Sequence, residues 1–326
     1  MLARLKGAID LYIAALFGAV LLASVLPARG SFVVVVTAVT NAAIVLLFFL
    51  HGARLSREAI LAGAGHMRLH GAALGTTFIV FPLLGLGMAA LPGMSPGIGA
   101  GLLFLTLLPS TVQSSIAFTA IARGNVAAAV CSASFSNLLG IFITPLLASL
   151  LMGRAGAGFS WESAEKITLQ LLLPFVSGHL LRPVVGGWVA RHRTLVTMVD
   201  RGSILLVVYS AFGAAVLSGL WHEVPPSGLA LIVALCSVLL AVVLAFTWWL
   251  AKVMAFARED AIVLLFCGSK KSLASGVPIA GVLFAPAQVG LIVLPLMVFH
   301  QIQLVVCAAL ARRFARTAGP GHAPAD

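Results

Sequence analysis

Charged residues are scarce in this chain. Only 9% of its 326 residues are Asp, Glu, Lys or Arg and 61% are hydrophobic, whereas a soluble domain carries roughly 25% charged residues. Apolar runs of about 18 residues or more recur along the whole length, and a helix needs only about 20 residues to cross a bilayer. The composition therefore predicts an integral membrane protein and leaves no room for a soluble catalytic domain.

Cysteine pairs and a cleavage motif are also missing. The four cysteines lie singly in apolar segments, so neither a disulfide framework nor a zinc site is indicated. The apolar run from residue 8 to residue 26 is long for a signal sequence, and no small-residue cleavage site closes it. We expect an uncleaved first span.

The net charge of +11 lies in short loops, where it indicates topology rather than nucleic-acid binding.

Ten apolar segments are long enough to form spanning helices. They lie near residues 8–27, 32–51, 71–91, 97–122, 126–152, 163–181, 202–221, 227–251, 261–284 and 289–311. Eighteen lysines and arginines remain when Lys270 and Lys271 are left out of the count. If the N-terminus lies in the cytoplasm, fifteen of them fall on the cytoplasmic side of the membrane. This bias predicts a multi-pass protein of the inner membrane with both termini in the cytoplasm. Residues 315–326 are predicted to be a disordered tail.

Ten helices divide into two sets of five, and an odd number per set makes the second set enter the membrane from the opposite face. We therefore predict two inverted repeats, residues 1–152 and 153–314, in one membrane domain. The fourth segment of each repeat is irregular, at Pro109 in the first and at Gly268 in the second. Paired broken segments at corresponding positions are the best sequence indicator of a transporter's binding site.

Lys270 and Lys271 lie inside the apolar stretch AIVLLFCGSKKSLASGVPIAGVLF, residues 261–284. If they formed a loop, the span before them would have only nine residues, too few to cross a bilayer. We therefore place both within the membrane, where a lysine costs about 2.5 to 3.5 kcal/mol and indicates function. Small polar side chains cluster at both broken segments and on the helices that follow. We predict a cationic crossing that binds substrate or ion through Ser110, Thr111, Gln113, Ser114, Ser115, Ser132, Ser136, Asn137, Cys267, Ser269, Lys270, Lys271, Ser272, His300 and Gln301.

Four segments resemble a known family. They are FFLHGARLSREA (residues 48–59), LPSTVQSSIAFTAIARGN (residues 108–125), CSASFSNLLGIFITPLL (residues 131–147) and FCGSKKSLASGVPIA (residues 266–280). They are similar to the bile acid:sodium symporters, and most similar to the SBF-like branch. The resemblance covers essentially the whole chain. It implies a panel of spans 1, 2, 6 and 7, and a core of spans 3 to 5 and 8 to 10, in which broken helices 4 and 9 cross.

The resemblance also implies alternating-access transport of an organic anion, which in coupled members moves with two sodium ions. Those members carry a glutamate on the ninth helix, followed four residues later by Gln-Asn. Here Cys267, Lys271 and Ser272 stand at these positions. Sodium prefers hard oxygen ligands, so sodium coupling is in doubt and no metal site is assigned.

The sequence leaves two roles for Lys271 open. Its ammonium could replace a sodium ion, bridging freed carbonyls and the hydroxyls of Ser114, Ser115 and Ser132. Alternatively, burial could make it exchange a proton, giving proton coupling.

Two further function classes stay open at this stage. The same fold without transport would be a membrane regulator, which the missing glutamate makes credible. An intramembrane hydrolase would use Ser269 or Ser272 as nucleophile and Lys271 as base, but no orienting group or oxyanion motif accompanies them. We therefore expect a transporter and no enzyme. The partners expected are the lipid bilayer and a small organic anion, and the oligomeric state is open.

Overall fold

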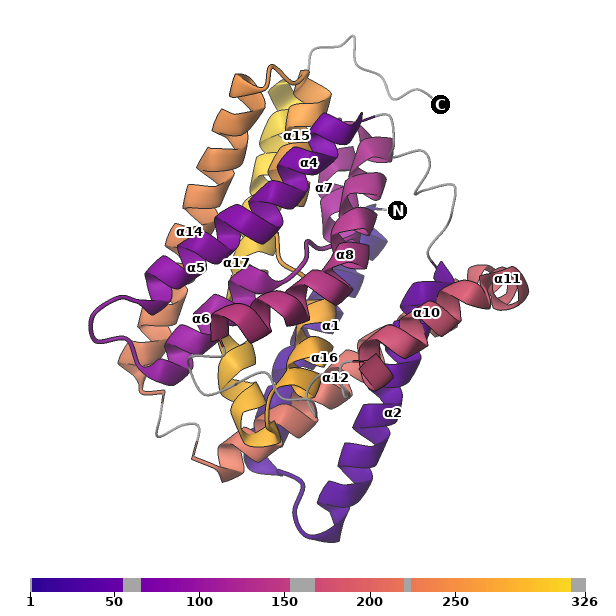
Figure 1. Cartoon of the computed structure of the whole chain (residues 1–326), viewed down its shortest axis with the longest axis vertical. Helices are drawn as coiled ribbons and strands as arrows, with labels where there is room; N and C mark the ends of the chain where they lie inside the picture. The colour runs from indigo at the N-terminus through magenta and orange to yellow at the C-terminus, as the bar shows by residue number, and fades with distance from the viewer. Residues whose placement is uncertain (1, 55–65, 153–167, 220–223, 318–326) are drawn as a thin grey trace. The chain divides into compact units, whose positions relative to one another are not determined.

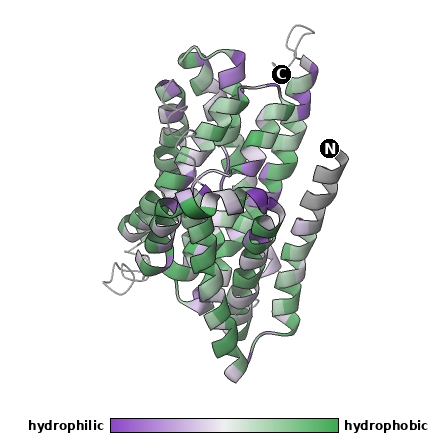
Figure 2. Ribbon diagram, turned by 90° about the vertical axis from the view of Figure 1, so that its right-hand side faces the viewer, coloured by the Kyte–Doolittle hydropathy of each residue, from purple (hydrophilic) through white to green (hydrophobic). Residues whose placement is uncertain are grey.

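The computed structural model of the chain describes residues 2–54, 66–152, 168–219 and 224–317, with the side chains of residues 2–11 and 13 left aside. Every regular element in these ranges is helical (Figure 1). Seven helices are long and apolar enough to cross a membrane, or eight if one bent pair counts as a span. Hydrophobic residues dominate their ribbons (Figure 2). The protein is therefore a helical, multi-pass membrane protein.

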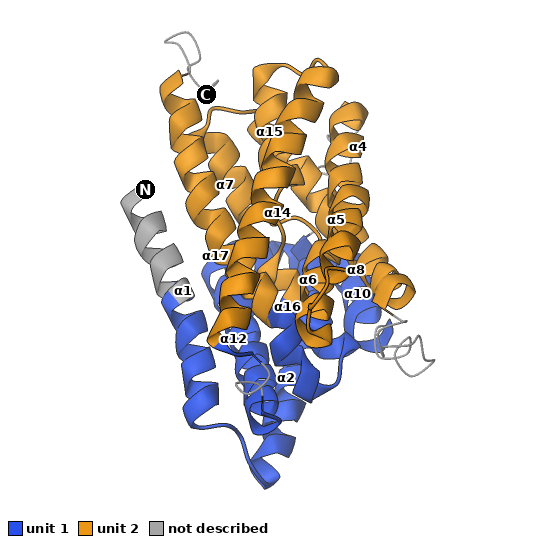
Figure 3. Ribbon diagram, turned by 90° about the vertical axis from the view of Figure 1, so that its left-hand side faces the viewer, with its two compact units in different colours: residues 1–55, 159–225, 277–293 blue, residues 56–158, 226–276, 294–326 orange. Residues whose placement is uncertain are grey.

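The described chain forms two compact units (Figure 3). Unit 1 comprises residues 1–55, 159–225 and 277–293. It groups the segments that the resemblance assigns to the panel, together with residues 277–293, which the resemblance assigns to the core. Its helices are α1 (Leu2–Val25), α2 (Ser31–Arg54), η4 (Thr168–Leu172), α10 (Leu173–Leu180), α11 (Arg182–Arg191) and α12 (Arg193–Leu217).

Helices α2 and α10 of unit 1 approach each other closely at two glycines. A Cβ on Gly52 would lie 1.9 Å from the Phe175 carbonyl oxygen, and a Cβ on Gly178 would lie 2.0 Å from the Phe49 carbonyl oxygen. Small residues of this kind let membrane helices bring their backbones together. At the end of α2, Arg54 forms an ion pair with Asp200 of α12.

Unit 2 comprises residues 56–158, 226–276 and 294–326. Its first half holds α4 (Met67–Gly75), the π-helix η2 (Thr76–Val80), α5 (Phe81–Ala89), α6 (Pro96–Leu107), α7 (Gln113–Ile121) and α8 (Val126–Met152). Its second half holds α14 (Pro226–Val253) and α15 (Arg258–Gly268). Two helices are shared between the units: α16 (Leu273–Leu283) begins in unit 2, and α17 (Pro286–Thr317) lies in unit 2 from residue 294 onward.

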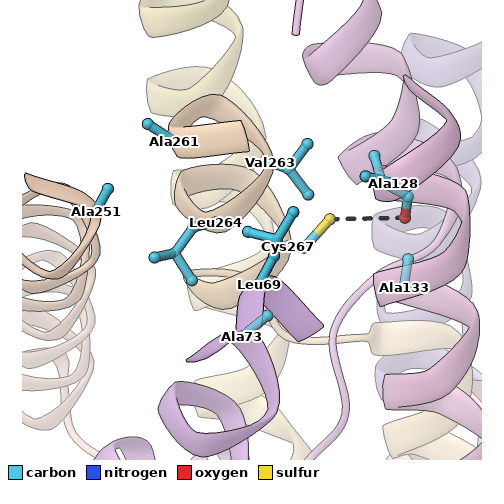
Figure 4. Close-up of a cluster of buried hydrophobic side chains, with 10 residues drawn as sticks. Leu69, Ala73, Ala128, Ala133, Ala251, Ala261, Val263, Leu264 and Cys267 are labelled. Carbon is cyan, nitrogen blue, oxygen red and sulfur yellow. Dashed lines mark hydrogen bonds between the residues drawn. The ribbon is translucent and has the colours of Figure 1, made fainter. Parts of the chain in front are cut away.

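The core of unit 2 contains a cluster of mostly small side chains. Ala73 of α4, Ala128 and Ala133 of α8, and Ala261 and Cys267 of α15 belong to it (Figure 4). Small residues at helix contacts let backbones approach closely in membranes. The packing holds α15, and with it the lysine pair, against α4 and α8.

Two sequence predictions need correction. Residues 182–201 were predicted to connect two spans, yet Arg182–Arg191 is helical and bent by 91° from Thr168–Leu180, and α12 already begins at Arg193. Pro183 explains the new start, because proline suits the first turn of a helix. Helix α17 continues to Thr317, so the predicted tail is helical at residues 315–317, and from residue 318 it lies outside the described residues. Residues 55–65, 153–167 and 220–223 also lie outside them.

Candidate functional site

Two helices of unit 2 are interrupted where the sequence predicted. Helix α6 ends at Leu107 and α7 begins at Gln113, with Leu108 already in an extended conformation (ψ 154°). Helix α15 ends at Gly268 and α16 begins at Leu273. We call residues 108–112 the first break and residues 269–272 the second break. Buried backbone groups at both breaks need partners, because water is absent at membrane depth.

Helix α8 supplies partners for the first break. Thr144 donates its hydroxyl to the Leu107 carbonyl at 2.8 Å. Ser136 accepts a hydrogen bond from the Ser110 N–H at 2.9 Å, and Asn137 donates to the Ser110 carbonyl at 2.7 Å. Of the predicted residues, Ser110, Ser136 and Asn137 are thus brought together. The Ser136 and Asn137 side chains bond the main chain of the first break at Ser110.

The second break is held by Gln303 of α17 and by the first break itself. The Gln303 side chain accepts from the Lys271 N–H and donates to the Lys271 carbonyl, both at 2.9 Å. The Ser272 N–H donates to the Pro109 carbonyl at 2.8 Å. This backbone-to-backbone bond joins the two breaks directly, so the two interrupted helices cross within unit 2.

The Lys271 side chain ends inside a cage of carbonyl oxygens. Its Nζ donates to the carbonyls of Thr77 at 2.9 Å, Thr106 at 2.8 Å and Leu108 at 2.7 Å. The Phe81 ring covers it, with its centroid 4.0 Å from Nζ. An ammonium has three N–H donors, and each has an acceptor here. We call these three oxygens the carbonyl cage; the lysine within it is fully buried.

Each carbonyl of the cage is free for a local reason. In η2 the Phe81 N–H donates to the Thr76 carbonyl, so the Thr77 carbonyl would need the N–H of residue 82, which is proline. The Thr106 carbonyl would ordinarily bond the N–H of Ser110, which bonds Ser136 instead. Leu108 lies in the extended first break. The π-helix, the proline and the break thus create the cage together.

Lys270 is in a different position from its neighbour. It is also fully buried, but its Nζ has one long hydrogen bond, 3.4 Å to the Ser114 hydroxyl. Two aromatic rings lie around it, with centroids 4.4 Å away for Phe118 and 5.5 Å away for Phe266. Cation–π contact stabilises a desolvated ammonium by about 2 kcal/mol. Lys270 is therefore a buried cation with fewer hydrogen bonds than its donors allow.

The hydroxyls predicted to contact Lys271 have other partners. Ser115 donates to the Phe266 carbonyl at 3.0 Å, Ser132 bonds His70 at 2.6 Å, and Ser114 bonds Lys270. The carbonyl part of the predicted bridge is present, and the hydroxyl part is wrong. The Lys271 ammonium bonds the three carbonyl oxygens because they have no hydrogen-bond partner in their own helices, whereas each hydroxyl has a partner elsewhere.

Other predicted residues lie away from the cage. Cys267 donates its thiol to the Ala129 carbonyl at 3.7 Å, inside the cluster of small residues (Figure 4). Ser269 donates to the Leu265 carbonyl of its own helix. Gln113 is exposed, and the Gln301 amide nitrogen is buried without a hydrogen-bond partner. These residues do not line the carbonyl cage.

Three predicted residues contact the site indirectly. The Thr111 hydroxyl bonds Ser114 at 2.7 Å, the Ser272 hydroxyl bonds Ser275 at 3.1 Å, and His300 bonds Gln303 at 2.8 Å. Neither Ser269 nor Ser272 is a hydrogen-bond partner of the Lys271 ammonium, so neither forms a dyad with Lys271.

Sequence reasoning missed several residues that build the site. Gln303, which binds the Lys271 main chain, was not among the predicted site residues. Thr77 and Thr106 act through carbonyl oxygens, which carry no side-chain signal. Pro82 was a usable signal, because a proline within an apolar helix frees a carbonyl upstream.

Residues 10–316, nearly the whole chain, match the SBF-like CPA transporter family. The chain belongs to this family. Its relatives include the Uncharacterized protein PA2026 of Pseudomonas aeruginosa, 57% identical over 94% of this chain and 93% of its own. The putative symporter YfeH of Escherichia coli is 54% identical over the same shares. Sodium/bile acid cotransporter 7 of Rattus norvegicus is 26% identical over 83% of this chain and 82% of its own. As an SBF-like family member, the protein is placed among multi-pass membrane transporters.

Proposed function

We propose that this SBF-like family member is a secondary transporter of an amphipathic organic anion, in which Lys271 occupies the place of a coupling sodium ion. Ten spans form two inverted repeats, residues 1–152 and 153–314, with the termini in the cytoplasm. The interrupted spans are the fourth, near residues 97–122, and the ninth, near residues 261–284. The transported anion moves by alternating access across the inner membrane.

The carbonyl cage carries this proposal. Three carbonyl oxygens converge at 2.7 to 2.9 Å on one positive charge, which is the type of oxygen donor that hard cations take in proteins. In this chain the cation is the ammonium group of the Lys271 side chain. A second cation beside it would meet like-charge repulsion in a region of low dielectric constant. The cage therefore supports transport without sodium.

The same geometry favours a permanent cation over proton exchange. A neutral amine has two N–H donors and a lone pair, so deprotonated Lys271 would point that lone pair at a carbonyl oxygen. It would also leave one buried acceptor unpaired, which costs about 1–3 kcal/mol. The carbonyl cage therefore stabilises the charged form. Of the two roles left open for Lys271, replacement of a sodium ion by its ammonium is the better supported. We call this role the tethered cation.

Lys270 supports an anionic substrate. It is a buried charge without a full set of hydrogen-bond partners, and charges inside a membrane protein mark substrate or ion pathways. Helices α7 and α16 both begin at the crossing, and each helix start adds about half a positive charge. These positive groups favour a carboxylate or a similar anion.

The decisive experiment uses proteoliposomes with sodium and proton gradients imposed separately. Wild-type protein is expected to move an organic anion, such as a bile-acid-like carboxylate, equally well with sodium or potassium outside. Transport that requires sodium would contradict the tethered cation, and transport driven by a proton gradient and lost in Lys271→Gln would identify Lys271 as a proton carrier. Absence of solute movement for every anion and gradient would favour the regulator.

A further inference from the structure

A groove runs between α14 and α17 within unit 2. Its volume is about 740 Å³, and Leu265 of α15 also lines it. On α14 it is lined by Leu240, Leu244 and Trp248, which are four residues apart and share one helix face. Its lining is predominantly apolar.

The length of the groove fits one leaflet of a bilayer. It extends along α14 from Ser237 to Trp248, which at 1.5 Å per residue is about 16 Å. The hydrocarbon core of a bilayer is about 30 Å thick, so one leaflet is about half of this. A single acyl chain would therefore fit along the groove without crossing the midplane.

One end of the groove is basic. Arg313 lines it and is exposed. Arg258 donates one guanidinium nitrogen to the carbonyl of Phe314, which also lines the groove, while its other terminal nitrogen is buried without a partner. Lys252 Nζ lies 5.9 Å from the centroid of the Trp248 ring. Basic groups from three helices thus surround the end that the charge bias predicts to be cytoplasmic.

An apolar groove of one leaflet's length with a basic end matches one ligand chemistry. A buried guanidinium nitrogen without an acceptor costs free energy, and phosphate is a strong acceptor for arginine. Basic pockets between membrane helices on the cytoplasmic side bind anionic lipid headgroups. We propose that this groove binds one anionic glycerophospholipid, with an acyl chain between α14 and α17 and its phosphate at Arg313 and Arg258. The proposal is independent of the transported substrate.

Trp248 provides a direct probe of the groove. The purified protein is placed in phosphatidylcholine nanodiscs that contain a minor fraction of brominated phosphatidylglycerol or brominated phosphatidylcholine, and tryptophan fluorescence is measured. Bromine on the acyl chain quenches only tryptophans that it touches. Subtracting the Trp248→Phe signal isolates Trp248. Trp249, which is 56% exposed, serves through Trp249→Phe as the control for bulk lipid.

We expect brominated phosphatidylglycerol to quench Trp248 at a several-fold lower fraction than brominated phosphatidylcholine. Arg313→Gln should weaken this preference about fivefold, since one basic residue near an anionic lipid contributes about 1 kcal/mol. Arg312→Gln is the matched control, because Arg312 is exposed but does not line the groove.

Three outcomes would overturn the proposal. Equal quenching of Trp248 by both lipids would show no preference for anionic lipid, and equal losses in Arg312→Gln and Arg313→Gln would show a diffuse surface charge effect. Displacement of the phosphatidylglycerol signal by a soluble amphipathic carboxylate, such as cholate, would show that the groove binds solutes instead.

Discussion

The side-chain amide of Gln303 binds both main-chain polar groups of Lys271. Its oxygen accepts from the Lys271 N–H and its nitrogen donates to the Lys271 carbonyl, both at 2.9 Å. A glutamine thus replaces the two hydrogen bonds that an uninterrupted helix would supply at this residue. The backbone can leave the helix at the second break because α17 carries this side chain, and the lysine is thereby directed into the carbonyl cage.

Gln303→Leu should lower stability because it leaves a buried N–H and a buried carbonyl without partners. Each hydrogen bond contributes about 1 kcal/mol and an unsatisfied buried group costs about 1–3 kcal/mol, so we expect a loss of several kcal/mol. The measurement is thermal unfolding of the detergent-solubilised protein. Gln301→Leu is the control, because the Gln301 amide nitrogen is buried without a partner. Equal losses in the two variants would contradict the role of Gln303.

Lys271→Ala should empty the carbonyl cage and leave three oxygens without a donor. We expect a lower melting temperature that n-butylammonium or sodium partly restores, because either cation can enter the space and bind the freed oxygens. The wild type should show no such response. Lys270→Ala is the matched control, since Lys270 donates to a hydroxyl rather than to the cage. If added cations stabilise both variants equally, the carbonyl cage is not a cation site.

Pro82→Ala should destabilise the protein, although removing a proline from a helix ordinarily stabilises it. The new N–H would bond the Thr77 carbonyl within its own helix and compete with Lys271 for this oxygen. Pro145→Ala is the control, because Pro145 lies inside α8 and frees no carbonyl of the cage. A melting temperature that rises equally in both variants would show that Thr77 does not depend on Pro82.

Gly52→Ala and Gly178→Ala should each disrupt the α2–α10 pair of unit 1. The added Cβ would lie about 2 Å from a backbone oxygen in both cases, and overpacking of this kind costs about 1–3 kcal/mol or more. The fraction of monodisperse protein after extraction measures the effect. Gly187→Ala should behave like the wild type, since no atom lies within 4 Å of its added Cβ. Normal extraction of the Gly52 and Gly178 variants would contradict this close approach.

The interruptions in the helices could be predicted from sequence because their causes are local. Pro109 cannot donate a hydrogen bond, and Gly268 with the polar residues after it weakens a helix wherever it lies. The bend after Leu180 could not be predicted, because arginines beside an apolar run are equally compatible with a loop. Helix α11 forms there because Pro183 suits a helix start.

The candidate site was predictable only in part. Lys271 stands out because a charge in an apolar span is costly, but its partners are the main-chain oxygens of Thr77, Thr106 and Leu108. Every residue has such an oxygen, and in the side-chain pattern only Pro82 points to one of the three, the Thr77 carbonyl that it frees. Their availability depends on a π-helix and an extended residue, which require the folded backbone.

If the protein transports an anion as proposed, the carbonyl cage affects the energetics of the transport cycle. A sodium ion that enters with an anion compensates its charge, whereas the Lys271 ammonium stays with the protein when the substrate leaves. Each turnover of a monoanion would then move one net negative charge across the membrane. An interior-negative potential of 100 mV opposes its entry, and favours its exit, by about 2.3 kcal/mol. A tethered cation therefore makes the membrane voltage itself a driving force for export.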